Sequence, residues 1–362
     1  MNEYYKNIIY QIVSALIILL ILMMLKTNDI SGYKNYSNLL FCVLTSNLFS
    51  LSIPSRMTYE IGVLKNIDNL RNKYITSSLI YTVSLLPYLI ISLGLSLKFL
   101  FIAILGVLLN IFFTIKRSYA EGRRDYSKGR IIRLIQSIVI YSVPILIYAP
   151  TIFYLGLSFA FLFVLLYLYR PKLSIQFPKK LLIISILMVA IGSLERSVVL
   201  RSAFSSEVFF NIDIFSKQNI FLNAGIPLLL TTTVVKRFSI LRYVFVVLGY
   251  IICGGILLFL IFSPVLTNNF KLELSLFVSS VMIVCSGALH VLFLKNAESW
   301  RMYILGLAAT LLLTFLLSEL VQSEYIVIYR STIHMFIVIL IYYSLRSKNG
   351  AKFNTWLNSF VV

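Results

Sequence analysis

The chain has 362 residues, of which 59% are hydrophobic and only 12% are charged, whereas soluble proteins are about 45–50% apolar and about 25% charged. Its mean hydropathy is +0.92. Because these few charges cannot cover the surface of a soluble protein, the composition excludes a soluble globular protein. It indicates an integral membrane protein, and the long unbroken apolar runs predict spanning helices.

The net charge of +19 comes from 32 lysines and arginines against 13 acidic residues. In a soluble protein such a balance would suggest nucleic acid as a partner. In a membrane protein, basic residues between spans set the topology and meet anionic lipid. We therefore expect contact with anionic membrane lipid at the cytoplasmic face and no nucleic-acid partner.

Twelve apolar runs are long enough to cross a bilayer, which needs roughly 20 mostly apolar residues. They are residues 8–25, 36–58, 75–96, 97–115, 132–149, 151–169, 181–200, 208–235, 240–263, 273–294, 302–320 and 325–345. The first run is followed by Lys26, Thr27, Asn28 and Asp29 and not by a small-residue cleavage site, so we expect a retained span. The connecting loops are short, so we expect no extramembrane domain.

The basic residues alternate between the two sides of the membrane under this count of spans. With the N-terminus in the cytoplasm, inside segments hold 24 lysines and arginines and outside segments hold six. Such an asymmetry at successive loops is the pattern of the positive-inside rule. The sequence therefore predicts an all-α membrane protein of twelve transmembrane helices with both termini in the cytoplasm.

The spans divide into two sets of six with the same orientation, which predicts N- and C-terminal six-helix bundles over residues 1–180 and 181–362. Two six-span halves of one orientation allow a parallel repeat about an axis along the membrane normal, a common plan in transporters. Pro54 and Pro227 lie in the second span of their respective halves, and each follows an aromatic residue by 18 positions. This agreement favours the repeat.

A few charged residues fall within or at the ends of spans, where a charge costs about 2.5–3.5 kcal/mol at the bilayer centre on insertion scales. Such residues need partners or a wet cavity. The candidates for a substrate cavity between the halves are Arg56, Glu195, Arg196, Asp213, Lys217 and Arg330. The alternative is a purely structural role, since Asp213 with Lys217 and Arg56 with Glu60 have the i,i+4 spacing of ion pairs within one helix.

Motifs for cofactors and covalent chemistry are missing from the sequence. It holds no phosphate-binding loop, no nucleophile elbow and no zinc-binding motif. Its three cysteines and its two histidines, His290 and His334, lie in apolar runs and form no ligand cluster. We therefore expect a transporter and not an enzyme, with no cofactor or metal, although a coupling ion of unknown identity remains open.

Three segments resemble the bacterial polysaccharide-unit flippases of the multidrug/oligosaccharidyl-lipid/polysaccharide exporter superfamily. Residues 32–56 run from a Gly/Tyr-containing turn into a helix that ends at Arg56, residues 195–227 run from an acidic residue through an aromatic entry to a proline, and residues 116–133 form a basic inner loop. The first helix departs from the family pattern, since it keeps few of the usual polar residues.

The resemblance implies movement of an undecaprenyl-pyrophosphate-linked oligosaccharide across the bacterial inner membrane by alternating access, as in O-antigen and lipopolysaccharide biosynthesis. It implies that other polysaccharide-assembly membrane proteins are partners. Arginine suits phosphate because its planar fork donates two hydrogen bonds together. We therefore predict that Arg196 or Arg330 contacts the pyrophosphate and that Glu195 supplies a counter-charge.

Two other functions fit the same span count. A membrane-embedded polysaccharide polymerase of the same pathway would ordinarily carry a large outer loop, and the outside loops predicted here are short. A small-solute or drug exporter of the same superfamily would favour an acidic cluster in the N-terminal half, where Glu60 is the only acid near a span.

Overall fold

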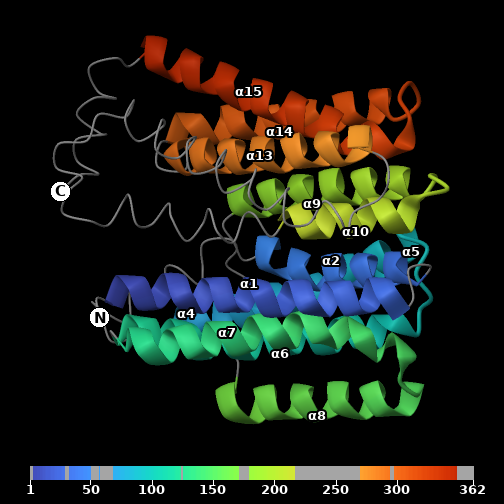
Figure 1. The fold of residues 1–362 in the computed structure, drawn as a ribbon. Helices are drawn as coiled ribbons and strands as arrows, with labels where there is room; N and C mark the ends of the chain where they lie inside the picture. Colours follow the sequence, from blue (N-terminus) through green and yellow to red (C-terminus); the bar gives the residue numbers. More distant parts are fainter. Residues whose placement is uncertain are drawn as a thin grey trace. The chain divides into compact units, whose positions relative to one another are not determined.

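The computed structural model describes residues 3–28, 32–49, 57, 68–123, 125–170, 179–216, 270–293 and 297–348. Within these ranges every regular element is helical and no strand occurs (Figure 1). The α-helices are α1 (Glu3–Asn28), α2 (Tyr33–Phe49), α4 (Asp68–Ile80), α5 (Leu86–Ser92), α6 (Phe99–Gly122), α7 (Tyr126–Ser142), α8 (Thr151–Tyr169), α9 (Lys179–Val199), α10 (Ser205–Ser216), α13 (Phe270–Phe293), α14 (Ala297–Leu317) and α15 (Ile326–Lys348). Three short helices join them: η1 (Tyr81–Leu85, π-helical) and the 3-10 helices η2 (Val143–Tyr148) and η5 (Ser323–Tyr325).

Among the described residues, five helical segments are long and apolar enough to cross a membrane. They are Leu70–Ser92, Phe99–Gly122, Tyr126–Tyr148, Thr151–Tyr169 and Ser323–Ile341. They overlap the predicted third, fourth, fifth, sixth and twelfth spans, so the all-α, multi-pass membrane class agrees with the structure. The total of twelve spans and the side of the termini stay predictions, since the ninth predicted span and most of the eighth lie outside the described residues.

The chain forms two compact units. One comprises Leu16–Ser197, and the other comprises Met1–Ala15 with Val198–Val362. The predicted division into halves at residue 180 stays a prediction. We describe each unit by itself and call them the Leu16–Ser197 unit and the Val198–Val362 unit.

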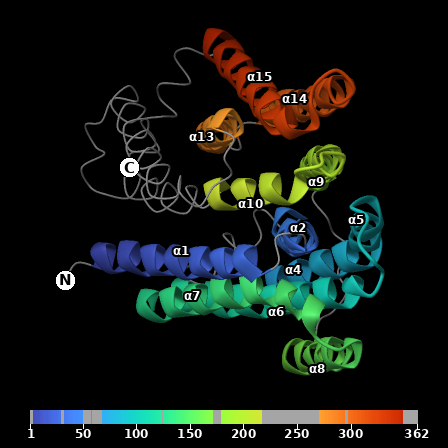
Figure 2. The ribbon, with the colours of Figure 1, turned by 45° about the vertical axis from the view of Figure 1, so that its right-hand side comes forward.

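Helix α6 is the centre of the Leu16–Ser197 unit, because α2, α7 and α8 all pack against it. Helix α8 lies on the side of α6 away from α2, as the two views agree (Figure 2). The α2–α6 contact is close: a Cβ added to Gly106 would lie 2.6 Å from a methyl of Val43. A small residue here lets the two backbones approach, as is common between membrane helices.

Helices α4, η1 and α5 form one continuous helical segment with a π turn in its middle. Pro87, in the first turn of α5, has no backbone N–H and cannot continue a regular ladder. The extra residue of the π turn accommodates this break. Tyr81, the first residue of that turn, is buried, and its hydroxyl donates to the carbonyl oxygen of Cys42 on α2 at 2.5 Å.

In the Val198–Val362 unit, α15 packs against both α13 and α14, and α10 packs against α13. The hydroxyl of Ser279 on α13 donates to the carbonyl oxygen of Val327 at 3.2 Å and lies 2.6 Å from the hydroxyl of Ser331 on α15. These small polar residues allow a close, hydrogen-bonded contact between membrane helices.

Candidate functional site

Helix α2 of the Leu16–Ser197 unit carries several buried polar side chains. Its side chains Ser37, Asn38, Thr45 and Ser46 are between 0% and 2% exposed, although an apolar core ordinarily holds few such groups. Buried polar groups need hydrogen-bond partners, or each costs about 1–3 kcal/mol. The partners come from several neighbouring helices, so α2 is held by polar contacts on more than one side.

Arg196, near the end of α9, reaches the first half of α2. Its Nη1 donates to Ser37 Oγ at 3.0 Å and to Asn38 Oδ1 at 3.1 Å. Its guanidinium carbon lies 4.6 Å from the ring centroid of Phe41, a cation–π distance. Arg196 is only 8% exposed, so this cation is held inside the unit by neutral groups of α2.

In the side-chain amide of Asn38, the oxygen has a hydrogen-bond partner and the nitrogen has none. A guanidinium only donates hydrogen bonds, so the oxygen of Asn38 must face Arg196 and the nitrogen must face away. Asn38 Nδ2 is buried and has no hydrogen-bond partner in the structure. A buried donor therefore remains available beside a buried cation.

The same face of α9 approaches α2 and α5 closely. A Cβ added to Gly192 would lie 2.9 Å from two ring carbons of Phe41. Ser193 Oγ lies 3.4 Å from Ser92 Oγ at the end of α5. The ring of Phe41 is thus held between Gly192 and Arg196, which fixes the side chains around the guanidinium.

The other predicted cavity residues are distributed along the chain. Glu195 is buried beside Arg196 on α9, 6% exposed, and points about 100° away from it around the helix. Asp213, on α10, is buried and belongs to the Val198–Val362 unit, as does the partly buried Arg330 on α15. Arg56 and Lys217 lie outside the described residues. A single cavity shared by all six therefore stays a prediction.

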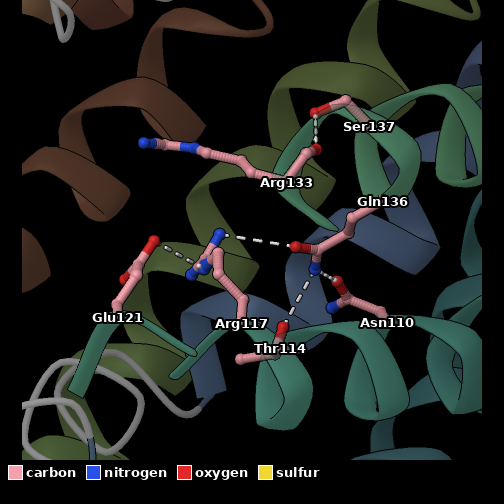
Figure 3. Close-up of polar contacts among 7 residues, drawn as sticks. All are labelled: Asn110, Thr114, Arg117, Glu121, Arg133, Gln136 and Ser137. Atoms are coloured by element: carbon pink, nitrogen blue, oxygen red, sulfur yellow. Dashed lines mark hydrogen bonds and ion pairs between the residues drawn. The ribbon is translucent and has the colours of Figure 1, made fainter. Parts of the chain in front are cut away.

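A second polar cluster, which sequence reasoning missed, joins α6 and α7 (Figure 3) and extends to α2. Gln136 Nε2 donates to Asn110 Oδ1 at 2.7 Å and to Thr114 Oγ1 at 2.9 Å. Asn110 Nδ2 in turn donates to Ser46 Oγ on α2 at 3.2 Å. The sequence did offer a signal for this cluster, namely neutral amide side chains within apolar runs. A buried amide needs hydrogen-bond partners, which in a helix bundle come from other helices.

This cluster continues toward the end of α6 through charged groups. Arg117 Nη1 donates to Gln136 Oε1 at 3.4 Å, and Arg117 Nε lies 3.8 Å from Glu121 Oε1. Both charged side chains are partly exposed, at 25% and 29%. The cluster therefore runs from the buried Ser46 in the last turn of α2 to the partly exposed end of α6.

Basic residues gather at one end of the α4–α8 segment. Arg71, near the start of α4, contacts Tyr119 near the C-terminus of α6 and Tyr169 at the C-terminus of α8. The N-terminus of α4 and the C-termini of α6 and α8 therefore lie together, and α7, which follows α6 directly, begins at this end. We call it the basic end; its described cations are Arg71, Lys73, Lys116, Arg117, Arg123, Lys128, Arg130, Arg133 and Arg170. The opposite end of this segment, at residues 93–98 and 143–151, carries Lys98 alone. The structure therefore places these cations at one end of the segment, and the cytoplasmic orientation of residues 116–133, which rests on the positive-inside rule, stays a prediction.

Comparisons with known proteins add no family. No family model, no curated protein and no solved structure matches this chain. The described residues contain no group of three or more histidine, cysteine or acidic side chains that could hold a metal ion.

Proposed function

We propose that the chain is a flippase that moves an undecaprenyl-pyrophosphate-linked oligosaccharide unit across the bacterial inner membrane by alternating access. Support comes from the multi-pass helical architecture, the polar interior of the Leu16–Ser197 unit and the family resemblance of residues 32–56, 116–133 and 195–227. Transport of this kind forms and breaks no covalent bond. It requires a site that binds a polar head while the lipid tail stays in the bilayer.

The observation that carries this proposal is the open Asn38 amide beside Arg196. An unsatisfied buried donor costs about 1–3 kcal/mol, and an oxygen of the substrate would remove that cost. A phosphate oxygen accepts from Nδ2 and is attracted by the adjacent guanidinium.

The α2–α9 site is closed in this structure, because Arg196 is 8% exposed and Asn38 is 1% exposed. A substrate head would reach them only after α9 separates from α2. The contacts to be broken include two hydrogen bonds and one cation–π contact, each of which contributes on the order of 1 kcal/mol, together with the packing of Phe41 against Gly192. Alternating access requires such an open state as a minor population.

The test replaces residues of this site in the cell of origin and measures surface polysaccharide and protein level. Arg196→Ala and Asn38→Asp should abolish export, the second because a buried carboxylate beside Arg196 would neutralise it. Arg196→Lys should restore little, since an ammonium lacks the planar fork. The matched control is Arg201→Ala, which removes an exposed arginine paired with Glu319 at 3.0 Å and should leave export unchanged.

Normal export in Arg196→Ala and Asn38→Asp, at normal protein level, would mean that the α2–α9 contact is structural and that the proposed site is wrong. Full activity in Arg196→Lys with none in Arg196→Ala would mean that the site requires only a positive charge. Loss of the protein in every variant is separated from loss of function by comparing membrane abundance and thermal stability after purification.

A further inference from the structure

Arg71 lies at the basic end, where α4, α6 and α8 meet. Its Nη1 donates to the Tyr119 hydroxyl at 3.4 Å and its Nη2 donates to the carbonyl oxygen of Tyr169 at 3.4 Å. Its guanidinium carbon also lies 5.6 Å from the ring centroid of Tyr169. Charge-assisted hydrogen bonds to an anionic oxygen are ordinarily about 2.7–2.9 Å long, so these two contacts to neutral oxygens are long.

The Tyr169 hydroxyl is the second element of this site. Tyr169 is 9% exposed, and its hydroxyl is buried without a hydrogen-bond partner in the structure. A phenol is a donor that usually finds a partner when it is buried. This hydroxyl belongs to the ring whose centroid lies 5.6 Å from the Arg71 guanidinium carbon, and an oxyanion would give the hydroxyl an acceptor and the guanidinium an opposite charge.

The end of α8 adds a third donor and an apolar border. Arg170 follows Tyr169 directly, is exposed and ends the helix in the left-handed conformation at φ 38°. The preceding turn exposes Leu166 and Leu168 to 46% and 50%. Helix α8 packs chiefly on α6, and most of its apolar side chains are not buried, so acyl chains have a large surface along this helix.

We propose that Arg71, Tyr169 and Arg170 bind the phosphate of an anionic phospholipid, whose acyl chains lie along α8. Basic pockets between helices at the cytoplasmic side are suited to such head groups. The exposed apolar border selects a lipid over free phosphate, because a soluble anion gains nothing from it. This site is separate from the α2–α9 contact and does not depend on the proposed transport function.

The test measures binding of phosphatidylglycerol to the purified full-length protein in a neutral detergent by native mass spectrometry and by the shift in thermal unfolding temperature. Phosphatidylcholine with the same acyl chains and inorganic phosphate serve as comparison probes. Phosphatidylglycerol should bind and raise the unfolding temperature. Phosphatidylcholine should bind at least tenfold more weakly, and millimolar phosphate should neither stabilise the protein nor compete.

Variants locate the site. Arg71→Gln should weaken phosphatidylglycerol binding at least tenfold, and Tyr169→Phe, which removes one oxygen and leaves the packing intact, should weaken it about two- to tenfold, as expected for one hydrogen bond. The controls are Lys73→Gln at the same end and Lys98→Gln at the opposite end, which remove the same charge and should change binding less than twofold.

Equal binding in Tyr169→Phe and the wild type would overturn the assignment of the hydroxyl. Equal losses in Arg71→Gln and Lys98→Gln would show that only total charge matters and would overturn the site. If inorganic phosphate stabilises the protein as much as phosphatidylglycerol does, the ligand of this site is a soluble anion and the lipid proposal is wrong. None of these outcomes affects the flippase proposal, because Arg71 and Tyr169 are distinct from the α2–α9 residues.

Discussion

Replacing Gln136 by Leu should destabilise the Leu16–Ser197 unit more than any comparable change on the exposed side of α7. The substitution removes two good hydrogen bonds, of 2.7 Å to Asn110 Oδ1 and 2.9 Å to Thr114 Oγ1. It leaves the Asn110 oxygen without its donor. Thr114 can turn its hydroxyl to its own helix, so most of the cost comes from Asn110.

The magnitude follows from the number of good contacts. Hydrogen bonds between membrane helices contribute about 0.6 kcal/mol on average and about 1.7 kcal/mol at most. Two such bonds give about 1–2 kcal/mol, and the 3.4 Å contact from Arg117 adds little because it is long. Gln136→Leu should therefore lower the free energy of unfolding by about 1–2 kcal/mol.

The assay is reversible unfolding in mixed micelles, with Ser137→Leu as the matched control. Ser137 is the next residue on α7, is partly exposed, and donates to the carbonyl oxygen of Arg133 in its own helix. A double-mutant cycle with Asn110→Leu should give a coupling energy of about 0.5–1.5 kcal/mol. A Gln136→Leu variant as stable as Ser137→Leu, or a coupling energy of zero, would refute the reasoning.

Three further predictions concern packing and orientation. Gly106→Ala should destabilise the protein by about 1–3 kcal/mol through overpacking against Val43, and Val43→Ala should restore part of the loss; an unchanged unfolding transition would contradict the close α2–α6 approach. Tyr81→Phe should cost about 0.5–1.5 kcal/mol in the same assay, and no cost would mean that its bond to α2 is not formed in the membrane. With native cysteines replaced, Lys128→Cys should react with an impermeant maleimide only after the membrane is opened, whereas Lys98→Cys should react in intact spheroplasts; the reverse pattern would invert the topology.

The sequence predicted the helical membrane class because apolar run length is a local property that needs no tertiary information. The five long apolar helices among the described residues overlap predicted spans. The excess of basic residues at one end of the α4–α8 segment was also predicted, because the positions of lysine and arginine between the apolar runs are visible in the sequence. The π turn had a local signal in Pro87, but a proline does not specify whether a helix kinks, ends or inserts a residue.

The partners of buried polar residues could not be predicted, because they depend on which faces of distant helices meet. Arg196 was singled out by its charge, yet its contacts with Ser37 and Asn38 join residues nearly 160 positions apart. Asn110 and Gln136 were overlooked because neutral amides leave no charge signature. Of the predicted cavity residues, the structure describes Glu195 and Arg196 in one unit and leaves a shared cavity with Arg330 as a prediction.

The central claim is that the chain transports an anionic lipid-linked head group through the α2–α9 site. The most direct measurement reconstitutes the purified protein in proteoliposomes that hold a polyprenyl-diphosphate-linked sugar with a fluorophore on the sugar, and adds an impermeant reductant. Wild-type protein and Arg201→Ala should make the whole pool of probe accessible, whereas Asn38→Asp should leave only the outer-leaflet share reduced. If the wild type resembles protein-free vesicles, or if Asn38→Asp flips the probe as fast as the wild type, the account is contradicted.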